Sequence, residues 1–217
     1  YTVPHRLEYD VDDLSIHQFH LMAYMLLLLH IEPVLAHMNT FLMQYQRLSF
    51  LNHQKLVELD KMEIEHVEEK QNTAGLDLSA GGDEQVLVVR NGNKTLAVEA
   101  FNFRDTVALV DHLEFLFRKY KLETIYGDAG GLGKPILDQL RINWDIKYVL
   151  NQAKPYNSLA YLNRGAELWF SVAKLIEYGD IIVPRETKLR KQLASRYYVV
   201  TPQNKLQLES KKQARSK

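Results

Sequence analysis

Two acidic residues stand in segments that otherwise carry apolar side chains. Asp77 lies between Leu76 and Leu78, and Asp128 stands at the carboxyl end of a predicted strand that contains Thr124, Ile125 and Tyr126. A carboxylate inside an apolar strand is costly unless something compensates its charge, and a cation would do so. Open α/β sheets place their ligands at the carboxyl ends of the strands, where acids on adjacent parallel strands would converge. The pair therefore predicts a site for divalent cations.

Paired carboxylates of this kind support the hydrolysis of phosphodiesters. They hold two divalent ions about 3.5 to 4 Å apart, which activate water and stabilise the leaving oxygen. Mg²⁺ or Mn²⁺ suits such oxygen ligands. A structural interpretation is also open, in which Asp77 is a turn or edge residue and Asp128 caps a helix. Spacing alone does not decide between the two.

The glycine-rich run from Gly127 to Pro135 resembles a phosphate-binding loop but lacks its pattern. The motif GxxxxGK[ST] needs glycine where Asp128 stands and serine or threonine where Pro135 stands. The glycines instead allow a sharp turn from strand to helix or a close approach of backbone amides to a phosphate. Lys134 could donate to a phosphodiester. We find no Walker motif in the chain and expect no ATPase activity from it.

The elements that must position these residues follow from the hydrophobic pattern. β-rich runs separated by glycine predict an antiparallel meander, Asp105 is a good N-cap for the next helix, and later strands that alternate with helices should lie parallel to the first. The order β-β-β-α-β-α-β-α indicates an α/β protein with a ribonuclease H-like mixed sheet flanked by helices. The predicted strands are 73–79, 85–90, 95–103, 123–126, 146–150 and 181–183, and the predicted helices are 106–120, 135–140, 159–178 and 187–195.

The first 70 residues differ in composition from the rest of the 217-residue chain. All five methionines and seven of the eight histidines precede position 70, whereas all ten glycines lie at Gly75 or later. We therefore place a boundary near residues 69–74. Residues 1–70 are predicted to be a mainly helical segment or linker of unknown role, and residues 71–217 a ribonuclease H-like domain.

Several function classes are excluded by composition. The chain has no cysteine, which excludes disulfide scaffolds and thiol nucleophiles. The longest apolar stretch, Leu21 to Leu29, is too short to span a bilayer, so we expect no membrane segment. His17 and His20 share a helix face, but no further ligand is placed to complete a metal site with them. The start at Tyr1 lacks the order of a signal peptide, and we expect a processed, truncated or partial chain.

Charge is distributed unevenly although the formal net charge is zero. Residues 185–217 carry 10 lysines and arginines against 2 acidic residues, whereas residues 1–70 carry 5 against 11. A basic end of this kind could contact phosphate, although a solvated helix face is its commoner explanation.

Four segments, taken in order and spacing, resemble the C-terminal nuclease domain of the large terminase subunit of tailed bacteriophages, the motor that packages DNA into the capsid. The resemblance covers about residues 73–217. It is carried by GLDLSAGGD at 75–83, YGDAGGLG at 126–133, YLNRGAELW at 161–169 and LESK at 208–211.

The resemblance implies a metal-dependent endonuclease that cuts concatemeric viral DNA during packaging. Asp77 and Asp128 match the first two metal-binding acids of the family, and Asp83 falls where some members have a further acid near the metals. The third acid usually follows the LESK segment, beyond Lys217, which leaves the domain C-terminally incomplete. Glu209 is a poor substitute for it.

The resemblance also implies partners and a location. Double-stranded DNA is the expected substrate, and the portal protein and the small terminase subunit are the expected protein partners, in the cytoplasm of an infected bacterial host. The residues that we expect to contact DNA are Lys134, Arg164, Lys211 and Lys212. For Arg164 and Glu167, packing and DNA contact are both open.

Two other interpretations are compatible with the sequence. The chain could be a catalytically incomplete ribonuclease H-like module that binds DNA or packaging proteins without cutting, which the missing third acid favours. An actin-like sugar kinase or ATPase could also open with Gly75, Leu76 and Asp77, but the chain length and the lack of a later adenosine motif argue against it.

Overall fold

A computed structural model describes residues 53–78, 84–131 and 133–209. The predicted helices of residues 1–52, with His17 and His20, lie outside these ranges. The predicted site residues Asp83, Lys211 and Lys212 do as well.

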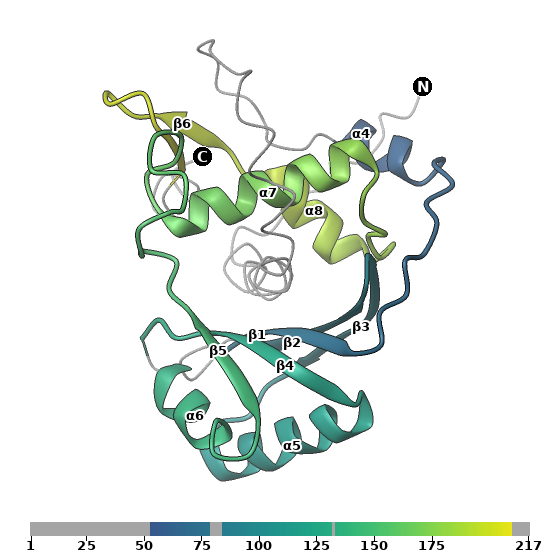
Figure 1. The fold of residues 1–217 in the computed structure, drawn as a ribbon, viewed down its shortest axis with the longest axis vertical. Coiled ribbons are helices and arrows are strands. Elements are labelled where there is room, and N and C mark those ends of the chain that lie inside the picture. Colours follow the sequence, from purple (N-terminus) through teal and green to yellow (C-terminus); the bar gives the residue numbers. More distant parts are fainter. Residues whose placement is uncertain (1–52, 79–83, 132, 210–217) are drawn as a thin grey trace, which may run out of the picture.

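A five-stranded mixed sheet forms the centre of the molecule, in the order β3-β2-β1-β4-β5 (Figure 1). The first three strands are antiparallel neighbours, whereas β4 lies parallel to β1 and β5 parallel to β4. This confirms the predicted meander and the parallel strands that follow it. The strands are β1 (Asn72–Asp77), β2 (Gln85–Asn91), β3 (Lys94–Phe101), β4 (Leu122–Asp128) and β5 (Asp145–Val149).

Two helices cover one face of the sheet, α5 (Thr106–Lys119) and α6 (Gly133–Leu140) (Figure 1). The Asp105 side chain accepts a hydrogen bond from the backbone N–H of Ala108 at 2.7 Å and so caps α5 as predicted. Leu76, Leu113 and Leu137 are fully buried between strands and helices on this face. Their burial fixes which side chains of β1 and β4 point to the opposite face.

The opposite face is covered by α7 (Arg164–Tyr178) and α8 (Thr187–Ser195) (Figure 1). A short hairpin of β6 (Tyr198–Val200) and β7 (Leu206–Leu208) follows them, which the sequence did not predict. Helix α7 begins later than predicted because the Asn163 side chain caps it, accepting from the N–H of Ala166 at 2.9 Å. The predicted strand at 181–183 is reduced to one bridge between Ile182 and Lys94.

The segment just before the sheet also packs on this second face. Leu56 and Leu59 of α4 (His53–Leu59) belong to the same buried cluster as the apolar residues of α7 and α8. A Cβ on Gly92, whose φ is +51°, would lie 1.5 Å from the Val67 carbonyl oxygen, so this segment crosses the β2–β3 turn at a place that only glycine permits. Residues 53–71 thus contact the domain, and the domain boundary near residues 69–74 stays a prediction.

No helix within the described ranges is long and apolar enough to span a bilayer.

Candidate metal-binding edge of the sheet

The two predicted acids lie side by side at the carboxyl ends of adjacent parallel strands. Leu76 of β1 pairs with Gly127 of β4, and Asp77 and Asp128 are the next residue on each strand. Asp77 is also opposite Val86 of β2, and Asp128 is opposite Val149 of β5. Four residues, one on each of four neighbouring strands, therefore form a row in which the two acids lie between two valines.

Alternation along the strands places both acids on the face that α7 and α8 cover. Leu76 packs on the α5 and α6 face, and a Cβ on Gly127 would lie 2.4 Å from the Leu137 side chain of α6. Successive side chains point to opposite faces, so Asp77 and Asp128 point the other way. The flanking Val86 and Val149 belong to the buried cluster of that second face.

Asp77 is buried, with 3% of its surface exposed. Its strand has a neighbour on each side, β2 and β4, so the interpretation of Asp77 as an edge residue is wrong. A buried acid beside a second acid is an unfavourable pair of like charges unless a positive charge lies between them. This is the arrangement expected of a cation site.

Asp128 is partly buried and held by neutral hydrogen-bond donors. Its Oδ1 accepts from the backbone N–H of Gly130 at 2.8 Å, and its Oδ2 accepts from Asn151 Nδ2 at 3.2 Å. Helix α6 begins only at Gly133, so Asp128 is not the helix cap that the alternative interpretation required. A Cβ on Gly133 would lie 2.6 Å from the Asp128 carbonyl oxygen, which explains part of the glycine run as a sharp turn.

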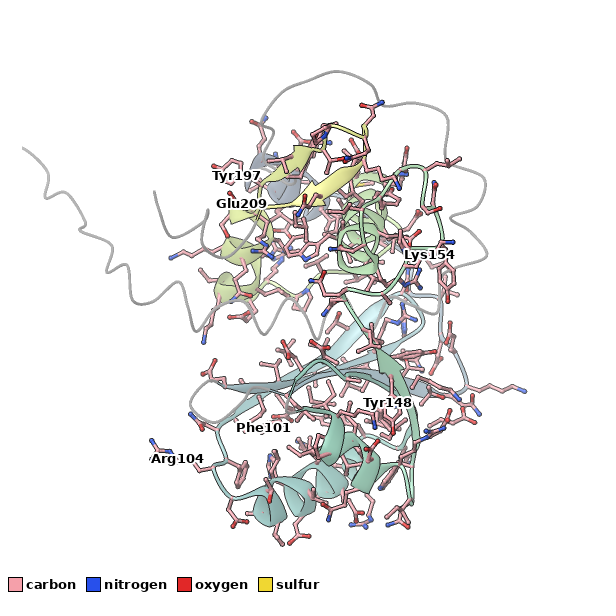
Figure 2. All side chains as sticks on the ribbon, turned by 90° about the vertical axis from the view of Figure 1, so that its left-hand side faces the viewer. Phe101, Arg104, Tyr148, Lys154, Tyr197 and Glu209 are labelled. Carbon is pink, nitrogen blue, oxygen red and sulfur yellow. The ribbon has the colours of Figure 1, made fainter. Side chains whose placement is uncertain are left out.

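Within ranges 53–78, 84–131 and 133–209, no group of three or more His, Cys, Asp or Glu residues could hold a metal ion. Asp83 lies outside these ranges, and its role stays a prediction. Glu209 is buried beside Tyr197 at the base of the hairpin (Figure 2). Its N–H donates to the Tyr197 carbonyl oxygen at 3.0 Å, and its Oε1 accepts from the Tyr197 N–H at 3.3 Å.

Arg164 and Glu167 form a buried ion pair at the start of α7. Arg164 Nη1 donates to Glu167 Oε2 at 2.7 Å, and the two side chains are each 10% exposed. The Glu167 carboxylate also accepts the backbone N–H groups of Tyr156 at 2.8 Å and Asn157 at 2.7 Å. The Arg164 guanidinium carbon lies 3.6 Å from the centre of the Tyr156 ring. These contacts favour packing over DNA contact, the question that the sequence left open.

The predicted DNA contact Lys134 is exposed on α6, one residue after the glycine turn. Its ammonium donates to Asp138 at 2.7 Å and lies 5.4 Å from the centre of the Tyr148 ring. The hydrogen bond to Asp138 raises the pKa of Lys134, so the side chain stays a cation at neutral pH. A phosphate would compete with an exposed carboxylate for it.

Three basic residues of the positively charged end are engaged within the fold. Lys188 pairs with Glu84 at 2.8 Å, and Arg190 pairs with Asp60 at 2.6 Å. Arg196 lies 5.4 Å from the centre of the Trp169 ring, and burial lowers its pKa. Contacts within the chain therefore engage the positive charges of these three residues.

Asn151 and Tyr156 were not singled out from the sequence. Both lie in the loop between β5 and α7, and their contacts with Asp128 and Arg164 join residues 23 and 8 positions apart. No spacing rule signals such contacts, because an asparagine or tyrosine after a strand is an ordinary loop residue.

The fold is that of nuclease domains from phage large terminase subunits. The nuclease domain of the large terminase subunit gp2 of bacterial virus Sf6 superposes with a TM-score of 0.65 at 14% identity, covering 78% of this chain and 91% of that one. The large terminase nuclease of thermophilic phage G20c gives a TM-score of 0.55 at 16% identity, covering 74% and 90%. The predicted ribonuclease H-like fold is thereby confirmed.

Related structures of the same two proteins contain metal ions. A mutant Sf6 domain is known with manganese, with a TM-score of 0.64 at 12% identity, and the G20c nuclease with bound magnesium, with a TM-score of 0.54 at 17% identity. They cover 78% and 77% of this chain, and 92% and 89% of those chains. No protein-family model and no curated protein sequence matches the chain.

Proposed function

We propose that this chain is the nuclease domain of a phage large terminase subunit and acts as a metal-dependent DNA endonuclease. The observation that carries the proposal is the pair Asp77 and Asp128, in register at the carboxyl ends of two central parallel strands. The likeness in fold to terminase nucleases supports the same activity. The substrate is concatemeric viral DNA, cut during packaging.

The residues at this edge fit divalent cations. A buried carboxylate and a hydrogen-bonded carboxylate supply hard oxygen ligands, which Mg²⁺ and Mn²⁺ prefer. When bound, two such ions supply a water of lowered pKa and stabilise the leaving oxygen of the phosphodiester. Asp77 and Asp128 bind the ions, and the burial of Asp77 keeps bulk water from its carboxylate. Asp83, which lies outside the described residues, is proposed as a further ligand.

DNA contact is proposed to involve mainly phosphate groups. Lys134 lies just past the glycine turn that follows Asp128, where its ammonium can leave Asp138 for a phosphate oxygen. Lys211 and Lys212 are proposed to extend this contact, and Arg164 to act mainly by holding its loop. Phosphate contacts carry no sequence information, so binding should be largely independent of sequence and should weaken with salt.

The proposal extends to the setting of the reaction. As part of a packaging motor, the domain would work with a portal protein and a small terminase subunit in the cytoplasm of an infected bacterium. These partners rest on the likeness to terminase nucleases alone.

Nicking of supercoiled plasmid tests the proposed activity. We expect the chain to nick with Mn²⁺, and we expect EDTA and Asp128→Asn each to abolish the nicking. Glu123→Gln is the matched control, because Glu123 is an exposed acid at the other end of the same strand. DNA binding with no nicking under any metal would instead indicate the catalytically incomplete module.

A further inference from the structure

The loop that follows β5 brings the Asn151 side chain to the candidate metal-binding edge. Strand β5 ends at Val149, opposite Asp128, and the Ala129 N–H donates to the Val149 carbonyl oxygen at 2.9 Å. Two residues later, Asn151 Nδ2 donates to Asp128 Oδ2 at 3.2 Å. Figure 2 shows the chain leaving β5 after Tyr148 and continuing past Lys154 toward the layer of α7. The loop between β5 and α7 therefore touches the candidate site through one side chain.

Both oxygens of Asp128 accept hydrogen bonds from the protein. Asn151 donates to Oδ2, and the Gly130 N–H donates to Oδ1 from the other side at 2.8 Å. An ionised carboxylate has about four lone-pair sites, and donors on both of its oxygens orient its plane. Ligating carboxylates in metal sites are commonly oriented by donors of this kind.

The backbone of Asn151 is itself joined to the start of α7. Its carbonyl oxygen accepts the N–H of Gly165 at 2.9 Å, and the Ala153 carbonyl oxygen accepts the N–H of Arg164 at 2.9 Å. Asn163 caps the helix in the same turn. The first residues of the loop therefore cannot shift without breaking bonds to the helix.

The buried pair of Arg164 and Glu167 holds the next part of this loop. Glu167 binds two backbone N–H groups of the loop, and Arg164 covers the Tyr156 ring. A carboxylate that accepts two amides and a guanidinium is fully engaged within its own chain. This arrangement makes the loop a rigid support for Asn151.

We propose that Asn151 is a positioning residue of the metal site, which orients the Asp128 carboxylate from a loop that Glu167 and Arg164 hold in place. The inference rests on the proposed function and deepens it. Removing a group that supports a ligand typically costs about 10- to 100-fold in metal affinity. Asn151→Ala should therefore weaken Mn²⁺ binding to the full chain by about that factor.

The test is the dissociation constant of Mn²⁺, measured by titration calorimetry on the wild type, Asn151→Ala, Asn151→Ser, Gln152→Ala and Asp128→Asn. Gln152 is the matched control, because it is an exposed amide one residue along that accepts from Asn163 at 3.3 Å. Melting of each metal-free variant in EDTA reports on folding. Asn151→Ser keeps the measurement possible should the alanine variant fail to fold.

We expect both Asn151 variants to bind Mn²⁺ about 10- to 100-fold more weakly at a nearly unchanged melting temperature, with Gln152→Ala within about twofold of wild type. Wild-type affinity in both Asn151 variants, beside loss of binding in Asp128→Asn, would overturn the positioning role alone. Absence of saturable Mn²⁺ binding by the wild type would overturn the proposed function and the positioning role with it.

Discussion

Asp77 and Glu167 are both buried acids, 3% and 8% exposed, but a charged group of opposite sign neighbours Glu167 and one of like sign neighbours Asp77. Glu167 lies against the Arg164 guanidinium and two backbone N–H groups. Asp77 lies beside a second acid, Asp128, at the next strand. Glu167 is paired within the chain, whereas for Asp77 and Asp128 we propose a bound cation. Under the proposed function, the charge of the neighbouring group, more than burial itself, separates a structural acid from a metal ligand.

The two regions are nevertheless joined. Glu167 holds the loop that begins at Asn151, and Asn151 donates to Asp128. Glu167 on α7 thus supports the loop whose Asn151 donates to Asp128 on β4. Even so, we expect the primary effects of mutations to differ, with activity affected at Asp77 and Asp128 and stability affected at Glu167.

The largest effect is expected at the strand ends. Asp77→Asn and Asp128→Asn should each lower Mn²⁺-dependent nicking by more than about 100-fold, beyond the range of a merely supporting group. Asparagine keeps the shape of the side chain and removes a buried charge, so the melting temperature should change little. A rate of nicking within tenfold of wild type in either variant would contradict the assignment.

The opposite result is expected at Glu167. Glu167→Gln leaves the buried Arg164 without its carboxylate and should destabilise the fold by about 3 kcal/mol or more, which is about 6 to 12 °C in melting temperature for a chain of this size. Glu177→Gln is the control on the same helix, because Glu177 pairs with Lys55 at the surface with half of its side chain exposed. Equal melting temperatures for the two variants would show that the buried pair of Arg164 and Glu167 stabilises the fold no more than the exposed pair of Lys55 and Glu177 does.

A third acid, Asp60, is also paired with an arginine, and the stability that this ion pair contributes should depend on pH. The hydrogen bond from Arg190 holds the pKa of Asp60 below its ordinary value of 3.8. A lowered pKa in the folded state means that the stabilisation is present above about pH 4 and is lost as the pH falls through the folded pKa. Asp60→Asn should lower the melting temperature at pH 7 by about 2 to 4 °C, which corresponds to about 1 kcal/mol.

The difference between wild type and Asp60→Asn should shrink when melting is measured between about pH 5 and pH 3. A difference that stays constant over this range would show that the ion pair of Asp60 with Arg190 of α8 does not stabilise the fold. Because Asp60 follows α4, the same measurement reports whether residues 53–60 belong to the folded domain.

The smallest effect is expected at Lys134. Lys134→Ala should reduce the slope of log Kd against log salt concentration for DNA by about 1, the value for one lost phosphate contact. Lys147→Ala is the control, because Lys147 is equally exposed and pairs with Asp145 on the edge strand β5. Equal slopes for the two variants would remove Lys134 from the DNA-binding surface.

The sequence predicted the central sheet well because its strands carry local signals. The glycine turns and the N-cap Asp105 define the meander and α5, and the bounds of α8 at 187–195 were predicted as the structure has them. The sequence placed Asp77 inside a strand at 73–79 and Asp128 at the carboxyl end of its strand, whereas in the structure each is the last residue of its strand. The parallel order of the strands then brought the two acids together.

The remaining differences come from contacts that no local pattern encodes. The cap at Asn163 ends the loop four residues after Leu159, where an uninterrupted helix was predicted, and Leu159 is left 87% exposed. The hairpin strands β6 and β7 have three residues each in a segment dominated by its basic charge. The bond between Asn151 and Asp128 depends on how the β5–α7 loop packs, which only tertiary structure determines.

The most direct test of the account is the position of Mn²⁺ in a crystal of this chain, located by anomalous scattering at the manganese edge. We expect a peak within ligand distance of both Asp77 and Asp128, about 2.0 to 2.2 Å from their carboxylate oxygens, and no peak there in Asp128→Asn. Manganese bound elsewhere, with the edge between β1 and β4 empty at saturating metal, would contradict the central claim that these two acids form a metal site.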